Sequence, residues 1–299
     1  MQTTKKIWMN GKFIPWDQAK VHILTHSLHY GSGVFEGIRA YDTKKGTTVF
    51  QLDAHINRLY YSAKAVHMEV PWTKKELKKA IIDTIKVNKI KSCYIRPIFY
   101  YGYGELRVGP GGCPTEGAIA VWPWGSYLGE EAIRVKVSDF IRIHPRSSVT
   151  DAKICGHYIN SMLAGLQATK NGYSEALLLD YDGNVAEGPG ENFFMVKDGK
   201  IVTPLLGAIL DGITRGSVIA LAKDLGFKVE ERTITLEEIY ASQECFFTGT
   251  AAEVTPIGSI NDKIISKKIG PITKKIKDEF AKITKGENEK YHKWLTIID

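Results

Sequence analysis

The feature that most constrains the fold is a break in the chain at residues 122–132, WPWGSYLGEEA. Its glycines and proline separate two portions that each carry their own strand-like and helix-like runs. A chain of 299 residues is long enough for about two domains. We therefore predict a small α+β domain over residues 1–124, a linker over 125–133 and a larger α/β domain over 134–299.

The first portion mixes strands and helices. IWMNGKFIPW, residues 7–16, predicts a hairpin, because its Asn-Gly pair tolerates the positive φ of a tight turn. Two amphipathic helices are expected, one capped by Asp53 and one over residues 73–88 capped by Thr73. CYIRPIFYYGYG and EGAIAVWPW predict strands on either side of a loop, ELRVGPGGCPT, whose glycines and prolines exclude regular structure.

The second portion begins with a predicted strand, AIRVKVSDFI. Asp-Gly turns between apolar runs predict two hairpins, within EALLLDYDGNVAEG and NFFMVKDGKIVTP. GITRGSVIALAKDLGF predicts a helix closed by Gly226, and PITKKIKDEFAKITKG predicts an amphipathic helix near the carboxyl end.

Composition limits the class of protein. The net charge of +7 comes from lysines spread over predicted helices, a pattern typical of solvated faces rather than of nucleic-acid binding. The 4 cysteines form no Cys-x-x-Cys pair, which indicates reduced thiols. No apolar run suggests a signal peptide or a membrane span. We expect a cytoplasmic protein without a membrane partner.

Two motif types carry weak signals. His22, His26 and His29 would share one helix face, as a metal site requires, but no Asp or Glu completes the set and the segment favours strand and loop. We predict no metal. The sequences GSG at 31–33 and GPG at 188–190 lack the strand-to-helix setting of a dinucleotide-binding loop.

Lys153 stands apart from the other lysines. It lies among small residues in TDAKICGHYINSMLAG, directly before a predicted amphipathic helix. Withdrawal from water favours the neutral amine, which can attack carbonyl groups. A packed lysine stem whose charge reaches solvent explains the same pattern, and the local sequence does not separate the two interpretations.

Several ordered motifs carry a resemblance to a known family. DAKICGHYINSMLA, EALLLD, VAEGPGENFF, DGITRGSV and FFTGTAAEVTPI together resemble the class IV aminotransferases, which are fold-type IV pyridoxal-phosphate enzymes. HSLHYGSGVFEGIRAY, HINRL, YIRP and PWGSYLG look like the branched-chain amino acid aminotransferases within that family. The resemblance runs from about Trp8 to the last predicted helix. It implies two domains of the D-amino acid aminotransferase type, with pyridoxal 5'-phosphate at their interface.

The resemblance also implies roles for residues around the cofactor. Lys153 would form the covalent link to pyridoxal phosphate and carry the proton between substrate and cofactor, and Glu187 would pair with the pyridine nitrogen. Tyr158 would bind the phenolic oxygen. The residues expected to hold the phosphate are Arg58, Ile213, Thr214 and Thr250. A packed arginine, a helix cap or a core tyrosine would explain several of these residues without any cofactor.

On the substrate side, the resemblance implies an aromatic lining with one arginine and backbone amides for the α-carboxylate. The implied residues are Tyr30, Phe35, Gly37, Tyr94, Arg96, Trp124, Tyr127, Thr250 and Ala251. Either Arg39 or Arg107 would serve the side chain of glutamate, and the sequence leaves both open.

The implied reaction is a reversible ping-pong transfer of the amino group between L-leucine, L-isoleucine or L-valine and 2-oxoglutarate. A D-amino acid aminotransferase and an aminodeoxychorismate lyase share this scaffold and are the alternatives. A basic protein that binds phosphate or nucleic acid without catalysis is the alternative of a different class. The resemblance further implies a homo-oligomer, at least a dimer and up to a hexamer.

Overall fold

The computed structural model describes residues 2–125, 128–129 and 131–298. Contacts between Cα atoms divide the chain into two compact units. One contains residues 1–125, 152–157 and 283–299, and the other contains residues 126–151 and 158–282. The short segment that carries Lys153 and the carboxyl-terminal segment therefore group with the first unit, whereas the sequence prediction placed both after residue 133. The predicted boundaries 1–124, 125–133 and 134–299 stay a prediction.

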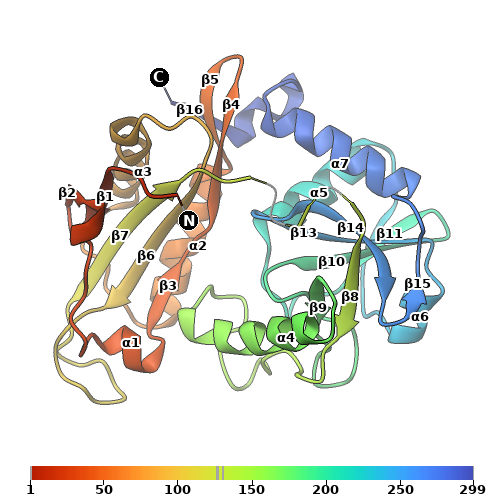
Figure 1. The fold of residues 1–299 in the computed structure, drawn as a ribbon, viewed down its shortest axis with the longest axis horizontal. Helices are drawn as coiled ribbons and strands as arrows, with labels where there is room; N and C mark the ends of the chain where they lie inside the picture. The colour runs from red at the N-terminus through yellow and green to blue at the C-terminus, as the bar shows by residue number, and fades with distance from the viewer. Residues whose placement is uncertain (1, 126–127, 130, 299) are drawn as a thin grey trace. The chain divides into compact units, whose positions relative to one another are not determined.

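The first unit is built on an eight-stranded sheet with the order β16-β5-β4-β6-β7-β1-β2, in which β3 also pairs with β6 (Figure 1). The predicted hairpin is confirmed, since Met9 pairs with Lys12 and both Asn10 and Gly11 have positive φ. The carboxyl-terminal strand β16 pairs antiparallel with β5. The strands are β1 (Lys6–Met9), β2 (Lys12–Pro15), β3 (Gly33–Phe35), β4 (Ile38–Thr43), β5 (Gly46–Phe50), β6 (Cys93–Tyr101), β7 (Thr115–Trp122) and β16 (Leu295–Ile298).

Two long helices pack on this sheet through a single apolar cluster: α2 (Leu52–Ala65) and α3 (Lys74–Asn88). The prediction for α3 is confirmed in detail, because Thr73 and Glu76 form a reciprocal capping box. The predicted cap of α2 is wrong. Gln51, in the left-handed region, is the N-cap, and Asp53 lies in the first turn, where its charge favours the helix dipole.

The histidine segment also differs from its prediction. Residues His26–Tyr30 form a short helix, α1, that Gly31 ends with a φ of 64°. Strand and loop were expected here because the apolar residues alternate. The glycine, which adopts a left-handed conformation at no steric cost, permits one helical turn instead. Short 3₁₀ turns lie at Trp16–Gln18, Cys155–His157 and Glu289–Trp294.

The second unit has its own mixed sheet, in the order β12-β11-β10-β13-β14-β8-β9, with β15 paired to β14. Its strands are β8 (Ile133–Val137), β9 (Glu175–Leu177), β10 (Asn192–Lys197), β11 (Lys200–Thr203), β12 (Val229–Glu231), β13 (Glu244–Gly249), β14 (Glu253–Ile260) and β15 (Lys263–Ile264). The hairpin of β10 and β11 around Asp198-Gly199 is confirmed. The other predicted hairpin forms around Asp182-Gly183, with a Leu179–Val185 bridge and hydrogen bonds that link Leu178 to residues 186 and 187, while β9 pairs in parallel with β8.

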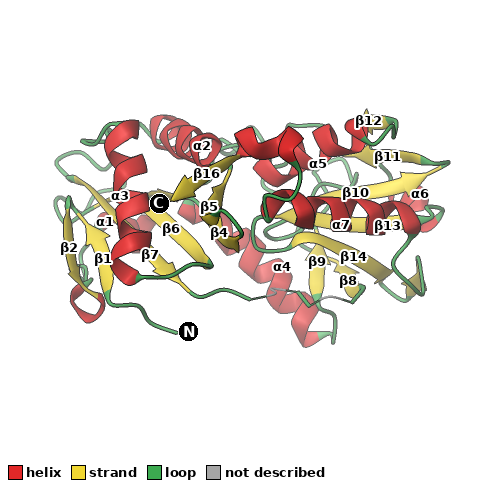
Figure 2. Cartoon of the chain, turned by 90° about the horizontal axis from the view of Figure 1, so that it is seen from above, coloured by secondary structure: helices red, strands yellow, loops and turns green. Residues whose placement is uncertain are grey.

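Helices cover this sheet (Figure 2). They are α4 (Tyr158–Lys170), α5 (Ile213–Asp224), α6 (Leu236–Tyr240) and α7 (Pro271–Thr284). Ala164 and Ala168 of α4 pack on Ala176 and Leu178, while the intervening Leu177 belongs to a second apolar cluster, so the strand faces the core on both sides. Gly226 follows α5 with positive φ, as predicted. Among the described residues, no helix is long and apolar enough to span a bilayer.

Candidate active site

The segment around Lys153 is held in the first unit by backbone contacts on two sides. The Lys153 N–H donates to Ser62 Oγ of α2 at 2.9 Å, and the Lys153 carbonyl accepts from the Phe35 N–H at 3.1 Å. Ile154 forms an antiparallel bridge with Val34 and is buried in the core. The Lys153 side chain is half-buried, with Nζ 5.2 Å from the centre of the Phe35 ring. The backbone at Lys153 is therefore fixed, and the side chain places its amine beside the aromatic ring of Phe35.

Arg58 is part of a buried cluster that also contains Glu36 and His55. Arg58 Nε and Nη2 donate to the two Glu36 oxygens at 2.6 and 2.9 Å, and His55 Nδ1 lies 2.7 Å from Glu36 Oε2. Burial would raise the pKa of Glu36, but the charge of Arg58 and the bonds from both partners hold that pKa well below its usual range. Burial lowers the pKa of His55 and outweighs the attraction of Glu36.

Glu36 and His55 were missed as site residues by the sequence analysis, although both lie inside motifs that it used, GVFEGIRAY and HINRL. The sequence nevertheless contains a signal for both residues. Glu36 is a lone acid in an apolar run, and His55 precedes Arg58 by three positions, which places both on one face of a helix. Charged residues in such positions are buried only when paired.

Five residues expected on the substrate side share one region of the first unit. The Arg96 guanidinium lies over the Phe35 ring at 4.6 Å and near the Tyr94 ring at 5.4 Å. Trp124 contacts Tyr94, with ring centres 4.8 Å apart. Gly37 allows this arrangement, because a Cβ there would lie 1.9 Å from the Tyr94 hydroxyl. Arg96 Nε is buried and has no hydrogen-bond partner among the described residues.

Tyr30 lies on α1, where its ring contacts His26 and is 43% exposed. Tyr127 lies outside the described residues. Of the two arginines proposed for glutamate, Arg39 is buried over the Tyr41 ring, whereas Arg107 is exposed and paired with Glu105.

The histidines of this segment do not share a metal site. His26 is buried, with Nδ1 2.7 Å from Ser32 Oγ and Nε2 2.7 Å from the carbonyl of Arg107. His22 and His29 are exposed. Within residues 2–125, 128–129 and 131–298, no three His, Cys, Asp or Glu side chains form a group that could hold a metal ion. His26 instead ties α1 to the loop that carries Arg107.

In the second unit, Glu187 is buried between donors from three segments. Its Oε1 accepts from Arg142 Nε at 2.6 Å, and its Oε2 accepts from Asn192 Nδ2 at 3.0 Å and from the Leu210 N–H at 3.1 Å. Gly212 is required beside this cluster, since a Cβ would lie 1.9 Å from Asn192 Oδ1. The cluster holds an acidic group in a fixed place away from bulk water.

The residues expected at the phosphate begin directly after Gly212. Ile213 and Thr214 open α5, whose first amide N–H groups have no carbonyl partner within the helix and whose dipole favours an anion. Thr250 and Ala251 form the turn between β13 and β14, and a Cβ on the preceding Gly249 would lie 3.2 Å from the Gly190 carbonyl. Tyr158 is half-buried at the start of α4.

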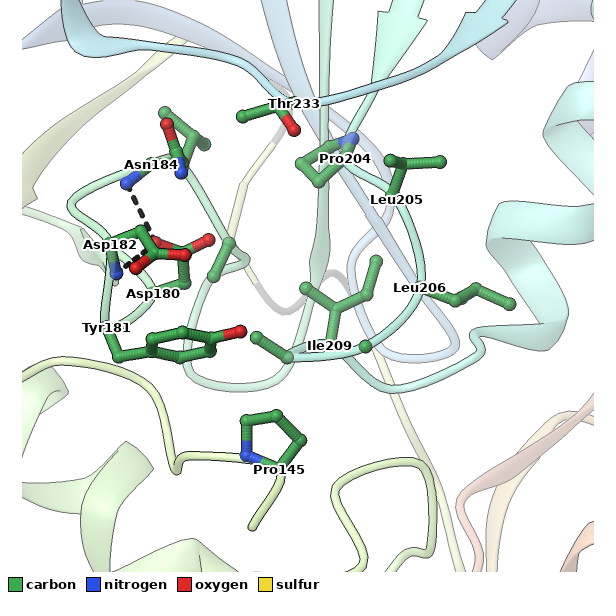
Figure 3. Close-up of a pocket in the computed structure, with 14 residues that line it drawn as sticks. Pro145, Asp180, Tyr181, Asp182, Asn184, Pro204, Leu205, Leu206, Ile209 and Thr233 are labelled. Atoms are coloured by element: carbon green, nitrogen blue, oxygen red, sulfur yellow. Dashed lines mark hydrogen bonds between the residues drawn. The ribbon is translucent and has the colours of Figure 1, made fainter.

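A cavity of about 200 Å³ lies elsewhere in the second unit (Figure 3). Asp180, Tyr181 and Asn184 line it from one side, and the loop that includes Leu205 and Leu206 lines it from the other. Asp180 Oδ1 accepts from the backbone N–H groups of residues 182 and 184 and thereby closes its own turn. None of the predicted site residues lines this cavity, so it is not the candidate active site.

Residues 33–260 match the model of the family "Amino-transferase class IV". The chain belongs to the class IV aminotransferases. A branched-chain-amino-acid aminotransferase of this family from Pseudomonas aeruginosa is 45% identical over 297 residues, which cover 98% of the present chain and 97% of the relative. Its counterpart from Escherichia coli K12 is 43% identical, with 99% of each chain covered.

Solved structures of class IV aminotransferases agree with the fold. The T.th. branched-chain amino acid aminotransferase with pyridoxamine 5'-phosphate superposes with a TM-score of 0.97 at 43% identity, over 100% of both chains. The same enzyme was also solved with N-(5'-phosphopyridoxyl)-L-glutamate. The predicted fold, a two-domain enzyme of fold-type IV with mixed α/β structure, is thereby confirmed.

The side chains of the present chain fit pyridoxal phosphate as the cofactor. The chemistry that it requires is an amine, a carboxylate for the ring nitrogen and a cation with amide donors for the phosphate. Among the residues expected at the cofactor, Lys153 carries an amine, Glu187 a carboxylate and Arg58 a cation, and α5 begins with amide N–H groups. The buried Arg96 Nε carries an N–H that no described residue accepts, and a guanidinium of this kind can donate to a carboxylate.

Proposed function

We propose that this chain catalyses the reversible transfer of an amino group between branched-chain L-amino acids and 2-oxoglutarate, with pyridoxal phosphate as cofactor. The observation that carries the proposal is the full-length likeness to a branched-chain aminotransferase solved with a phosphopyridoxyl-glutamate adduct. That compound joins the cofactor to glutamate, the product formed when 2-oxoglutarate accepts the amino group. The residue roles below extend the proposal to this chain.

Pyridoxal phosphate supplies an aldehyde that condenses with amines and a ring that accepts the electron pair left when a proton leaves the substrate Cα. Lys153 Nζ would hold the aldehyde in the absence of substrate and would give way to the amino group of the incoming amino acid. Its free amine would then carry the Cα proton between the substrate and the cofactor side. The hydrogen bonds from the Lys153 N–H to Ser62 Oγ and from the Phe35 N–H to the Lys153 carbonyl hold the backbone of Lys153 still while the side chain moves.

Glu187 keeps the pyridine nitrogen protonated. Its hydrogen bonds from Arg142, Asn192 and Leu210 stabilise the ionised carboxylate and fix its orientation. The phosphate is held by Arg58, by the first turn of α5 and by Thr250, which combine a cation, amide groups and a hydroxyl. Tyr158 donates to the phenolic oxygen of the cofactor.

The substrate side combines one cation with aromatic walls. Arg96, stacked on Phe35 and Tyr94, binds the α-carboxylate, together with the backbone at Thr250 and Ala251. Aromatic walls discriminate weakly between aliphatic side chains, because each methylene contributes only about 1–3 kcal/mol. Leucine, isoleucine and valine are therefore all expected as substrates. Tyr30, Gly37, Trp124 and Tyr127 complete the proposed lining.

We infer a homo-oligomer of at least two chains in the cytoplasm, on the strength of the family. The exposed Arg107 is then the arginine better placed to reach a neighbouring chain, and the buried Arg39 the one better placed to serve its own. Light scattering of the purified protein measures the number of chains.

Replacing Lys153 by Ala tests the proposal. We expect the wild-type protein to bind pyridoxal phosphate with visible absorption and to lose that absorption when L-leucine is added. The Lys153→Ala variant should show neither the visible absorption nor its loss on addition of L-leucine. Its turnover should fall by at least about 10³-fold, because both the covalent link and the proton carrier are gone. Lys170→Ala, at the exposed end of α4, is the control. Full turnover by Lys153→Ala contradicts the proposal, and preferential turnover of D-alanine or release of pyruvate from aminodeoxychorismate identifies an alternative enzyme.

A further inference from the structure

We propose that Glu36, supported by His55, is a positioning residue that orients the Arg58 guanidinium toward the cofactor phosphate and fixes it relative to Lys153. The inference rests on the proposed function, because it takes Arg58 as a phosphate ligand. It assigns a role to two buried titratable groups that the reaction itself does not use.

The geometry of the cluster supports orientation rather than simple attraction. Arg58 approaches Glu36 with Nε and Nη2, one nitrogen to each carboxylate oxygen, at 2.6 and 2.9 Å. Such a two-pronged contact fixes the plane of the guanidinium as well as its position. Because the shared edge is the one formed by Nε and Nη2, the remaining nitrogen, Nη1, points away from Glu36.

His55 holds the other side of the carboxylate. An ionised carboxylate only accepts hydrogen bonds, so His55 Nδ1 carries the hydrogen that meets Glu36 Oε2 at 2.7 Å. Glu36 has no exposed surface and His55 has 1%, so water does not replace either contact. Burial lowers the pKa of His55, which keeps the imidazole neutral. The cluster then contains one negative and one positive charge.

The same elements fix the lysine. His55, Arg58 and Ser62 follow one another at helical spacing along α2, and Ser62 Oγ accepts from the Lys153 N–H. On the opposite side, the Phe35 N–H donates to the Lys153 carbonyl, and Glu36 is the next residue after Phe35. Glu36 therefore joins the strand that holds Lys153 to the helix that carries Arg58, and α2 contacts β3 (Figure 1).

The substitution Glu36→Gln should weaken phosphate binding if Glu36 positions Arg58, and should strengthen it if Glu36 acts through its charge alone. Removal of a negative charge beside Arg58 makes the region more positive, which on electrostatic grounds alone strengthens the binding of a phosphate. Loss of the two-pronged contact releases the guanidinium from its orientation, because the amide of glutamine cannot accept from two donors with both of its atoms. A smaller contribution of the phosphate to cofactor affinity in Glu36→Gln would therefore indicate that Glu36 positions Arg58.

The test compares two forms of the cofactor on apoprotein prepared from the full chain. Dissociation constants for pyridoxal phosphate and for pyridoxal, which lacks the phosphate, are measured by absorbance for wild type and Glu36→Gln. We expect the constant for pyridoxal phosphate to rise at least about tenfold, equivalent to about 1.4 kcal/mol, with the constant for pyridoxal unchanged. Equal or tighter binding of pyridoxal phosphate overturns the proposal, as does equal weakening of both compounds.

Controls separate this proposal from the assignment of Arg58 itself. Arg58→Gln should remove the preference for the phosphorylated form, and Glu36→Gln added to it should change nothing further. If Arg58→Gln keeps the preference, the phosphate role of Arg58 fails; if it loses the preference while Glu36→Gln keeps it, only the positioning role fails. Glu244→Gln removes a buried carboxylate that caps α7 and should leave both constants unchanged.

A fold control completes the experiment. Thermal unfolding of each apoprotein shows whether Glu36→Gln is folded. If it is not, His55→Leu provides the answer, because it leaves the Arg58 contact in place while removing the imidazole and supplying no donor for Glu36 Oε2. We then expect a selective loss of pyridoxal phosphate affinity of about threefold, and no loss overturns the role of His55 in the proposal.

Discussion

Each unit of the molecule contains a buried glutamate paired with an arginine, and the two pairs are built differently. Glu36 is held by Arg58 and His55, and both side chains come from the single helix α2. Glu187 is held by Arg142 from a segment between β8 and α4, by Asn192 from β10 and by the backbone N–H of Leu210.

The difference separates a mechanical role from an electronic one. Three residues tied to one helix move together, so the Glu36 cluster is suited to keep a cation in a fixed place. Donors from three separate segments instead surround the Glu187 carboxylate and stabilise its charge from several directions. The same pair of residue types, glutamate and arginine, therefore serves orientation in one unit and charge stabilisation in the other.

The substitution with the largest expected effect is Glu187→Gln, which tests the electronic role of Glu187. We expect the half-reaction with L-leucine to slow on the order of 10²-fold, because a neutral amide does not keep the ring nitrogen protonated. The preference for pyridoxal phosphate over pyridoxal should stay unchanged, in contrast to Glu36→Gln. Single-turnover absorbance measures the rate, and titration of the apoprotein measures the preference. A normal rate, or an altered preference, would remove the electronic role of Glu187.

A second test concerns stability. Arg142→Met removes the partner of a buried carboxylate, and the loss of one member of a buried pair destabilises a protein by about 3–5 kcal/mol. Asp53→Asn breaks the exposed pair of Asp53 with Lys78 and should change the free energy of unfolding by less than about 1 kcal/mol. Urea unfolding of the apoproteins measures both. Equal, small effects would mean that the Glu187 pair contributes no more than a surface pair.

The sequence predicted the elements whose signals are local. Thr73 and Glu76 at the start of α3, the Asn10-Gly11 turn and Gly226 after α5 each specify the conformation of a few neighbouring residues. Local signals gave the wrong prediction where a residue distant in sequence determines the local structure. Asp53 favours a helix start, but Gln51 is the N-cap, and the Gln51 N–H donates to the carbonyl of Trp294 near the other end of the chain.

The site shows the same limit. Lys153, Glu187 and Arg58 were named because their motifs resemble those of a family, and no periodicity or spacing in the chain indicated their roles. The burial of Glu36 depends on a helix that begins sixteen positions later, so its pairing could not be read from GVFEGIRAY alone. The support for Glu187 from Arg142 and Leu210 is equally non-local, since neither is within twenty residues of Glu187 in sequence.

The smallest expected effect is on the free energy of unfolding at acidic pH, and it depends on His55 of the Glu36 cluster. Burial above all lowers the pKa of His55 from its usual value of 6.5, and the charges of Arg58 and Lys153 add to this, against the attraction of Glu36. The unfolded chain therefore binds a proton at His55 that the folded chain does not. The free energy of unfolding should fall as the pH drops below 6.5, by at most about 1.4 kcal/mol per pH unit.

His55→Asn should remove this decline between pH 6.5 and 5, because asparagine keeps a donor for Glu36 but does not titrate. Below pH 4.5, where glutamates in the unfolded chain become protonated, the lowered pKa of Glu36 causes a further loss in both proteins. Urea unfolding of apoprotein across this range is the measurement, and His22→Asn, at an exposed histidine, is the matched control. An unchanged decline in His55→Asn would show that His55 is not the group whose protonation opens the Glu36 cluster.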